Sequence, residues 1–290
     1  MGKSESLGLV VIGYHSDGVW ESFFTSLRAS HTQPADIVVV ENSPEVSPLL
    51  KKFSDFPITV VHRSDNPGYG AAANAGVAAL PPHITEVVIC NPDLTMEPEA
   101  LGLLLQELNT QSAAGVVGPR ILTSRGETYP SARAIPGIRI GIGHALLGRV
   151  WRRNPWSATY LGHYGELTPH SVGWLSGAFL MVKRDAFESL GGFDEGYFMF
   201  FEDVDLGFRL KKSGYRSFYI PAAEITHSGA HATKTDMPAM IAAHHRSAAR
   251  FLSLLYVGKR YAPLRVVLKT GLKVRSFIAY RLAKRTHGSR

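Results

Sequence analysis

The sequence predicts an α/β protein with a mostly parallel sheet covered by helices on both faces, followed by a basic helical extension. Short runs rich in β-branched residues alternate with segments of helical periodicity, which is typical of strands joined by crossover helices. The charge also divides the chain. Residues 237–290 contain 12 of the 31 Lys and Arg residues and no Asp or Glu, whereas residues 1–236 contain the other 19 with all 24 acids, so the net charges are +12 and −5. We therefore expect a first domain at 1–236 and an extension at 237–290.

The predicted elements of the first domain follow one another at short spacing. Each strand is an apolar run that suits a buried position, and each helix has apolar side chains three or four residues apart. The strands are Leu7–Tyr14, Asp36–Glu41, Ile58–His62, Glu86–Cys90 and Gly115–Gly118, and the helices between them are Gly18–Ser30, Gly70–Leu80 and Glu97–Leu108.

The pattern is lost between residues 123 and 168, where Gly, Pro, Arg and Trp are scattered without a period. An excursion of this length in a compact domain is commonly a functional loop or a lid. Regular structure then returns, with strands at Gly173–Val182 and Arg216–Ile220, a short helix at Arg184–Leu190 and a longer helix within Phe198–Ser213. Beyond Asp236 the sequence becomes helical and basic.

The composition and the length of the apolar runs limit the cellular locations that the sequence allows. Hydrophobic residues make up 45% and charged residues 19%, as in ordinary globular proteins. The single cysteine, Cys90, rules out an internal disulfide framework. The apolar run near the N-terminus is too short for a secretory signal, and no window reaches the roughly 18 apolar residues of a transmembrane helix. A cytoplasmic location is predicted.

Polar residues follow two of the predicted strands. Asn91-Pro92-Asp93 comes directly after Glu86–Cys90, at the carboxyl edge where open α/β sheets bind ligands. A carboxylate there can hold a divalent cation that neutralises a diphosphate, although the same tripeptide is common in plain turns. Glu41-Asn42 ends the second strand and could contact a ribose or a base, or simply cap a turn.

The glycine-rich segment between residues 66 and 76 reads NPGYGAAANAG. Its small residues allow close approach to a ligand or to a neighbouring element, and Asn66 and Asn74 could supply hydrogen bonds. The glycine spacing matches neither the dinucleotide-binding fingerprint nor the P-loop. A tight turn leading into a closely packed helix explains the segment equally well.

The strongest local signal is the acidic cluster Glu202, Asp203 and Asp205, which directly follows an aromatic run. Aromatic surroundings can desolvate a carboxylate and raise its pKa, as a general base requires. Asp205 and Arg209 are four residues apart on the predicted helix, so they can form an ion pair. His227 follows the last strand. A lone histidine is more often structural, but imidazole binds Mn²⁺ and Zn²⁺ when a carboxylate lies beside it.

Taken in order, seven segments resemble the inverting glycosyltransferase family 2, which has the GT-A fold. The likeness covers roughly residues 7–235 and is nearest to the rhamnosyltransferase branch that acts on polyprenyl-diphosphate-GlcNAc. The segments are VVIGY, VVVENS, NPGYGAAANAG, NPD, GWLSGAFLMVKR, GGFDEGYFMFFEDVDLGFRLKKSGY and THSG.

The resemblance implies a role for each matching position. It implies an enzyme that uses Mn²⁺ or Mg²⁺, takes dTDP-L-rhamnose as donor and works on a lipid-linked sugar acceptor. Asp203 would be the catalytic base, with Glu202 beside it, and Trp174 and Gly177 would shape the acceptor side. Asp93 would hold the metal, and His227 would be a second metal or diphosphate contact. The remaining donor-binding positions would be Tyr14, Glu41 and Asn42 at the nucleoside, and Asn66, Gly68 and Asn74 at the diphosphate.

Two positions depart from the family pattern. Position 41 is Glu where Asp is more usual, and Asn91 occupies the first position of the DXD-type motif, which leaves a single carboxylate. Other family 2 enzymes, which transfer galactofuranosyl, GlcNAc or mannosyl units, would share the fold and the metal site. A nicotinamide-dependent oxidoreductase is a different alternative, but the turn after the first strand lacks the glycine fingerprint.

The extension predicts a membrane partner. Arg265, Lys269, Lys273 and Lys284 recur at helical spacing among many apolar residues, a pattern that favours a helix lying on an anionic membrane. The enzyme would then be peripheral on the inner face of the cell membrane. Alternatively, the apolar stripe packs on the first domain or on a second subunit, as in a homodimer. The acidic balance of the first domain argues against nucleic acid as a partner.

Overall fold

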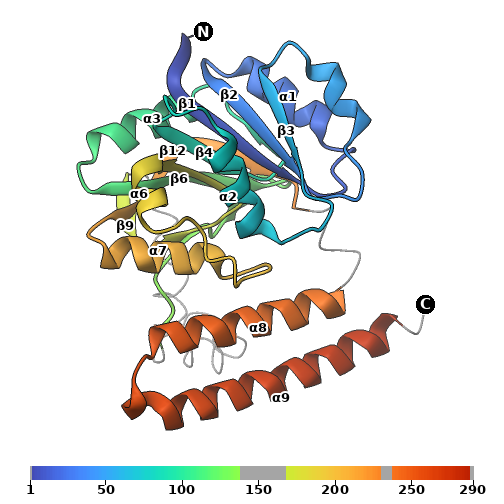
Figure 1. Ribbon diagram of the computed structural model, residues 1–290, viewed down its shortest axis with the longest axis vertical. Coiled ribbons are helices and arrows are strands. Elements are labelled where there is room, and N and C mark those ends of the chain that lie inside the picture. Colours follow the sequence, from blue (N-terminus) through green and yellow to red (C-terminus); the bar gives the residue numbers. More distant parts are fainter. Residues whose placement is uncertain (1, 138–167, 230–236, 288–290) are drawn as a thin grey trace.

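The computed structural model describes residues 2–137, 168–229 and 237–287, and its centre is a ten-stranded sheet (Figure 1). The strand order is β3-β2-β1-β4-β11-β6-β12-β5, with β7 beside β6 and β9 beside β12. The first strands and helices are β1 (Gly2–Gly13), α1 (Trp20–Ala29), β2 (Thr32–Glu41), β3 (Ile58–His62), α2 (Tyr69–Ala79), β4 (Glu86–Cys90), β5 (Leu94–Met96), α3 (Ala100–Thr110) and β6 (Ala114–Thr123), with the short 3-10 helix η1 (Pro48–Phe53) after β2.

The second half of the domain adds strands that run in both directions. Its elements are β7 (Thr128–Tyr129), β8 (Ala132–Arg133), β9 (His170–Val172), β10 (Trp174–Leu175), β11 (Phe179–Lys183), α6 (Arg184–Ser189), α7 (Glu202–Lys212) and β12 (Arg216–His227). Strand β11 lies antiparallel between β4 and β6, whereas β1, β2, β3 and β4 are parallel to one another.

The predicted sheet was therefore right in class, but it is mixed rather than mostly parallel. The chain reaches β11 from β10, at the edge where β4 ends, so β11 can only run back across the sheet in the opposite direction. The predicted strand Gly173–Val182 is in fact two strands separated by a turn at residues 176–178. The predicted strand Arg216–Ile220 is too short, because β12 continues to His227 through a register shift between Ile220 and Glu224.

Helices cover both faces of the sheet, and alternate residues of each central strand point to opposite faces. On one face Leu9 and Val11 of β1 pack with α1, η1 and α3. On the other face Val10 and Ile12 pack with α2, α6 and α7. Both layers are apolar and fully buried, so the strand ends are held on a rigid support.

The excursion predicted from 123 to 168 is only partly described. Its first part forms β7 and the β8 strand, which pairs with β10, and residues 138–167 lie outside the described residues. The idea of a lid over this segment therefore stays a prediction.

The extension forms a helical hairpin, with α8 (Met237–Leu255), the short 3-10 turn η2 (Lys259–Tyr261) and α9 (Ala262–His287). Figure 1 shows α8 lying against the body and α9 lying on the far side of α8. Phe251 of α8 is 1% exposed and shares a cluster with Trp174, Tyr197 and Val204 of the body. The helix α8 is thus part of the folded body in packing terms, although the charge boundary lies before it.

Among the described residues, no helix combines the length and the hydropathy needed to cross a bilayer.

Candidate active site

The ends of β1, β2 and β4 meet at one edge of the sheet because these strands are parallel and adjacent. Tyr14 follows β1 and is 40% exposed, with its ring against His15 at a centroid distance of 4.4 Å. Glu41 ends β2, and Asn91 follows β4. The structure therefore brings the predicted nucleoside and metal segments to a common edge.

Glu41 and Asn42 are buried beneath this edge. Glu41 is 1% exposed, and its Oε1 accepts a hydrogen bond of 3.0 Å from the backbone N–H of Ser43. The backbone N–H of Asn42 donates to the carbonyl of Gly13, and its side-chain Oδ1 is buried without a hydrogen-bond partner. A buried acceptor without a donor is unfavourable in the free protein, so a ligand that supplies an N–H or O–H would stabilise this position.

Asp93, in the link before β5, lies beside His227 at the end of β12. The Nε2 atom of His227 lies 2.8 Å from Oδ1 of Asp93 and 3.4 Å from Nδ2 of Asn91. Their approach is fixed by the antiparallel pairing of β5 with β12, in which His227 lies opposite Leu94. Ser228 adds two hydrogen bonds to the backbone carbonyl of Asp93. The sequence separated these two residues by more than a hundred positions, and the fold makes them neighbours.

One carboxylate and one imidazole fit a divalent cation in part. In the described segments there is no group of three or more His, Cys, Asp or Glu side chains that could hold a metal. Asp93 and His227 would therefore supply two ligands, and a cation of this kind completes its coordination with water or with phosphate oxygens of a substrate. The donor set suits a metal that arrives with a nucleotide diphosphate.

The glycine-rich segment is closed against the loop before α7. Gly68 has a φ of 96°, and a Cβ at this position would collide with the backbone carbonyl of Phe198. That carbonyl accepts a hydrogen bond of 3.1 Å from the N–H of Tyr69. Asn66 also has a left-handed backbone, with a φ of 41°. Gly68 is needed for this contact, because only glycine offers both the conformation and the space.

Asn74 uses its amide within the protein. Its Oδ1 accepts from the N–H of Phe193, and its Nδ2 donates to the Phe193 carbonyl, each at 2.9 Å. Nδ2 also donates to Glu195. Asn74 therefore holds the loop at residues 192–195, and any part that it has in donor binding comes through that loop.

The acidic cluster faces the turn between β10 and β11. Oδ2 of Asp203 accepts a hydrogen bond of 3.0 Å from the N–H of Gly177, and Oδ1 accepts one of 2.8 Å from the N–H of Val204. The predicted acceptor residue Gly177 is thus in direct contact with the predicted base. The hydroxyl of Tyr69 donates to the carbonyl of Gly177 at 2.5 Å.

Burial separates the acids of α7 by their proton affinity. Glu202 is 6% exposed, its Oε2 has no hydrogen-bond partner, and burial together with the nearby Asp203 raises its pKa to about 8. Burial also raises the pKa of Asp203, but its backbone hydrogen bonds from Gly177 and Val204 oppose that shift. These hydrogen bonds stabilise the charged form of Asp203, whereas Oε2 of Glu202 has no donor, so Asp203 is the more readily ionised of the two.

Asp205 has a structural role. Its Oδ2 accepts a hydrogen bond of 2.6 Å from Nε of Arg209, which confirms the predicted pair on the helix. Burial raises the pKa of Asp205 against the effect of Arg209. Of the three acids, Asp203 is the one whose carboxylate accepts a hydrogen bond from the turn between β10 and β11.

Trp174, the other predicted acceptor residue, is buried. It is 7% exposed, and its Nε1 donates to the carbonyl of Ala134 at 3.0 Å. The guanidinium of Arg133 lies 5.3 Å from the Trp174 ring, and its charge opposes the rise in the pKa of Asp203. The sequence did not single out Arg133, because it falls in the segment where periodicity is lost.

Three side chains of α8 hold the loop that leads to Asp203. Arg250 donates to both carboxylate oxygens of Asp194, at 2.7 Å from its Nη2, and lies 5.3 Å over the ring of Tyr197. Ser247 donates to the carbonyl of Met199 at 2.8 Å. The ring of His244 lies against Phe200 and Phe201.

The last two loop residues adopt an unusual backbone. Phe200 and Phe201 have φ values of 67° and 69°, a left-handed conformation that is costly for an aromatic residue. The contacts with α8 hold this conformation immediately before Glu202. Such a strained segment, supported from outside, is typical of a functional loop.

Tyr69 is the central residue that the sequence reasoning missed. Burial raises the pKa of its phenol well above the usual value, and Glu202, Asp203 and Asp93 all add to that shift. Its hydroxyl donates to the carbonyl of Gly177, whose N–H donates to Asp203, so Tyr69 lies beside the predicted base. The sequence shows that Tyr69 lies within the NPGYGAAANAG segment. The direction of its side chain, however, depends on contacts with Gly177, which comes much later in the chain.

Comparison with known protein sequences identifies the family of this chain. Residues 5–249 match the profile of the family described as "Glycosyltransferase like family 2". The chain is similar to the N-acetylglucosaminyl-diphospho-decaprenol L-rhamnosyltransferase of Mycobacterium tuberculosis, with 37% identity over 97% of this chain and 95% of that protein. It also resembles the Rhamnosyltransferase WbbL of Escherichia coli, with 37% identity over 28% of this chain and 31% of that protein.

Solved structures share the fold at low identity. The mannosyltransferase PcManGT from Pyrobaculum calidifontis, in complex with GDP-Man and Mn²⁺, covers 98% of this chain and 74% of its own, with a TM-score of 0.56 and 16% identity. S. aureus TarS 1-349 covers 85% of this chain and 65% of its own, with a TM-score of 0.54 and 12% identity. At this identity the likeness concerns the fold alone.

Proposed function

The chain belongs to glycosyltransferase family 2 and has the GT-A fold, and on that premise we propose that it transfers L-rhamnose from dTDP-L-rhamnose to polyprenyl-diphosphate-GlcNAc. The name of the mycobacterial relative supports both the sugar and the acceptor, since the likeness extends over nearly the whole of both proteins. The observation that carries the reaction is the geometry around Gly177, whose N–H donates to Asp203 at 3.0 Å and whose carbonyl accepts from the hydroxyl of Tyr69 in the glycine-rich segment.

On the donor side, Asp93 and His227 would hold a divalent metal. When bound, the metal neutralises the charge that builds up on the departing diphosphate. Glu41 and Asn42 would contact the nucleoside, and the unpartnered Oδ1 of Asn42 suits a donor on the base or the ribose. Tyr14 would lie over the nucleoside from its exposed position. Asn66 and Gly68 would shape the diphosphate side through the backbone of their loop.

On the acceptor side, Asp203 would act as the base. Its carboxylate removes the proton of the acceptor hydroxyl while that oxygen attacks the anomeric carbon of the donor sugar. The bond from this carbon to the diphosphate oxygen breaks in the same step, and the nucleoside diphosphate leaves with the bonding electrons. A single displacement inverts the anomeric centre. Glu202, which holds its proton at neutral pH, would keep the neighbouring charge low.

A panel of nucleotide sugars tests the proposal. The full-length enzyme is incubated with dTDP-L-rhamnose, UDP-galactofuranose, UDP-GlcNAc and GDP-mannose, each with the lipid-linked acceptor and with Mn²⁺, Mg²⁺ or excess EDTA. Transfer from the thymidine nucleotide that stops in EDTA is expected. Transfer from another donor would refute the rhamnosyl assignment, and full activity in EDTA would refute the metal.

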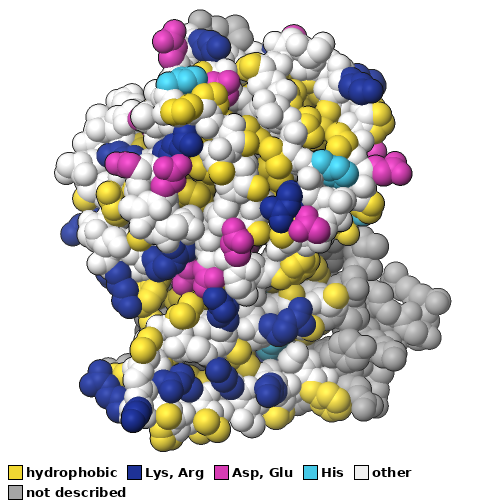
Figure 2. Space-filling model, viewed as in Figure 1, with side chains coloured by type: hydrophobic (Ala, Val, Ile, Leu, Met, Phe, Trp, Pro, Cys, Tyr) yellow, Lys and Arg dark blue, Asp and Glu magenta, His cyan; other side chains and the backbone are white. Residues whose placement is uncertain are grey.

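We also propose that α9 attaches the enzyme to an anionic membrane surface. Val266, Val267 and Val274 are 65%, 67% and 53% exposed, so this side of α9 is uncovered in the monomer. Figure 2 shows Lys and Arg side chains gathered over α8 and α9 and hydrophobic side chains along the outer rim of α9. Apolar residues beside cations are typical of helices that lie in the interface, and each cation near the surface adds about 1 kcal/mol of attraction.

Co-sedimentation with anionic vesicles at low and high salt tests this attachment. The comparison uses the full-length chain and a chain that lacks residues 258–290, which keeps α8. Salt-sensitive pelleting of the full-length protein alone is expected. Equal pelleting of both proteins would show that α9 does not attach the enzyme to the membrane. A concentration-dependent dimer that does not pellet would instead indicate that a second copy covers the valines.

A further inference from the structure

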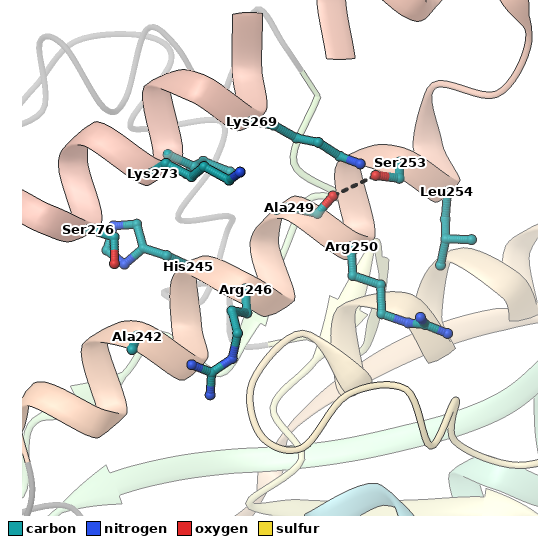
Figure 3. A pocket seen from close by; sticks show the side chains of 11 residues that line it. Ala242, His245, Arg246, Ala249, Arg250, Ser253, Leu254, Lys269, Lys273 and Ser276 are labelled. Carbon is teal, nitrogen blue, oxygen red and sulfur yellow. Dashed lines mark hydrogen bonds between the residues drawn. The ribbon is translucent and has the colours of Figure 1, made fainter. Parts of the chain in front are cut away.

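A groove of about 630 Å³ lies between α8 and α9, away from the strand ends that form the candidate active site. Figure 3 shows its lining, with Arg246 and Arg250 contributed by α8 and Lys269 and Lys273 by α9. His245 and Ser276 also line it. The groove thus collects four permanent cations from two helices, and none of the residues that line it is acidic.

The arrangement of these cations is unfavourable without an anion. Arg246 and Arg250 are four residues apart on α8, and Lys269 and Lys273 are four residues apart on α9, so each pair repels along its own helix. The extension contains no Asp or Glu that could neutralise them. Arg250 is paired with Asp194. Within the described part of the chain, Arg246, Lys269 and Lys273 form no ion pair, so the groove concentrates positive potential.

The position of the groove indicates an anion that is attached to a lipid. Val266 and Lys273 are seven residues apart and lie almost on one line along α9, so the cations border the exposed apolar side of this helix. If the valines enter the membrane, the lysines lie at the depth of the headgroups. The phosphate of a lipid is held at that depth and would reach the groove, whereas a free nucleotide is not held there.

The α8 side of the groove is connected to the loop that precedes Glu202. Arg250 contributes to the lining and also holds Asp194, and its neighbours Ser247 and His244 contact the loop that ends at Glu202. An anion in the groove would therefore be bound to the same helix that positions Asp203. That link favours the acceptor substrate over bulk membrane lipid.

We propose that the groove between α8 and α9 binds the diphosphate of the lipid-linked acceptor. This rests on the proposed function, since that reaction supplies an acceptor with a diphosphate. A diphosphate carries two or more negative charges on adjacent phosphates, and cations from two helices can approach it from both sides. A phospholipid headgroup with a single negative charge would leave most of the groove charge uncompensated.

The double variant Lys269→Gln/Lys273→Gln tests the groove, with Lys259→Gln/Arg260→Gln as a matched control that removes two cations of η2. With saturating donor and the acceptor in neutral phosphatidylcholine vesicles, the groove variant should raise the KM for the acceptor by roughly ten- to thirtyfold, as expected for the loss of two cations. Its kcat and its affinity for the donor should not change. The control variant should keep the KM of the unmodified protein.

Equilibrium binding without donor separates the sources of phosphate. Neutral vesicles that contain a polyprenyl diphosphate should retain the control variant and lose the groove variant. Binding to vesicles that contain phosphatidylglycerol should weaken equally for both variants. An unchanged KM and unchanged binding of the groove variant would overturn the proposal, as would a loss confined to phosphatidylglycerol. Because this arm needs no sugar transfer, it still tests the groove if the proposed reaction fails.

Discussion

The two halves of the candidate site are built in different ways. The donor half is set by strand ends, since Glu41 ends β2 and the Asp93–His227 contact follows from the pairing of β5 with β12. The acceptor half is set by a loop, residues 191–201, which Asn74 of α2 holds at the backbone of Phe193 and Arg250 of α8 holds at the side chain of Asp194. Both halves join distant parts of the chain, but the donor half is fixed by strand pairing, whereas the acceptor half depends on side-chain contacts from two separate helices.

The largest effect is expected at Asp203, where the acceptor half meets the chemistry. Asp203→Asn keeps the shape of the side chain but removes the base, so turnover should fall by a factor on the order of 10² to 10⁴ with donor affinity retained. Steady-state kinetics and donor calorimetry measure the two quantities. If Glu202→Gln is inactive while Asp203→Asn remains active, the base is the neighbouring residue.

At the donor half, Asp93→Ala should act through the metal. Loss of a metal ligand removes charge stabilisation at the leaving diphosphate, and turnover should fall by a factor on the order of 10² to 10³. Unlike Asp203→Asn, this variant should also lose the metal dependence of nucleotide binding, which calorimetry with and without Mn²⁺ would detect. Metal-dependent binding equal to that of the unmodified protein would separate Asp93 from the metal.

Arg250 tests whether the extension belongs to the acceptor half. Its pair with Asp194 is partly exposed, so Arg250→Met should cost at most about 1 kcal/mol of stability. Turnover should fall further than this loss explains, by roughly tenfold, because the loop before Glu202 loses a support.

Arg28→Met is the matched control for that variant. Arg28 pairs with Asp55 at 2.7 Å on the opposite side of the domain, and both side chains are exposed. A similar small loss of stability with unchanged turnover is expected. If the two variants behave alike in both thermal unfolding and kinetics, α8 has no special connection with the acceptor half.

The smallest effect concerns pH and stability. The pKa of Glu202 is raised from 4.5 to about 8 in the folded protein, so the folded state holds a proton that the unfolded state has lost between these values. The contribution of Glu202 is then full below about pH 4.5 and is lost as the pH rises to about 8. Glu202→Gln lacks this loss, so its melting temperature relative to the unmodified protein should rise by several degrees from pH 5 to pH 9. A constant difference would contradict the raised pKa.

The same comparison explains what the sequence could predict. The α/β class, the strands that end at Glu41 and Cys90, and the enzyme class were predicted correctly, because apolar runs and contiguous motifs encode them. The antiparallel direction of β11 was not predicted, since strand direction depends on where the chain enters the sheet. Arg250 was counted only as part of a basic tail, because its partner Asp194 lies 56 residues earlier and no local pattern connects them. The roles of the individual site residues stay predictions.

Phe200 and Phe201 also bear on how this enzyme could be improved. Glycine or asparagine would accept their left-handed backbone at lower cost, so a laboratory selection for heat resistance would be drawn to these two positions. The rings pack against His244, which ties the turn to α8. A variant that gains thermal stability by relaxing this turn would therefore hold Asp203 less precisely in position. A selection should measure thermal stability and turnover together.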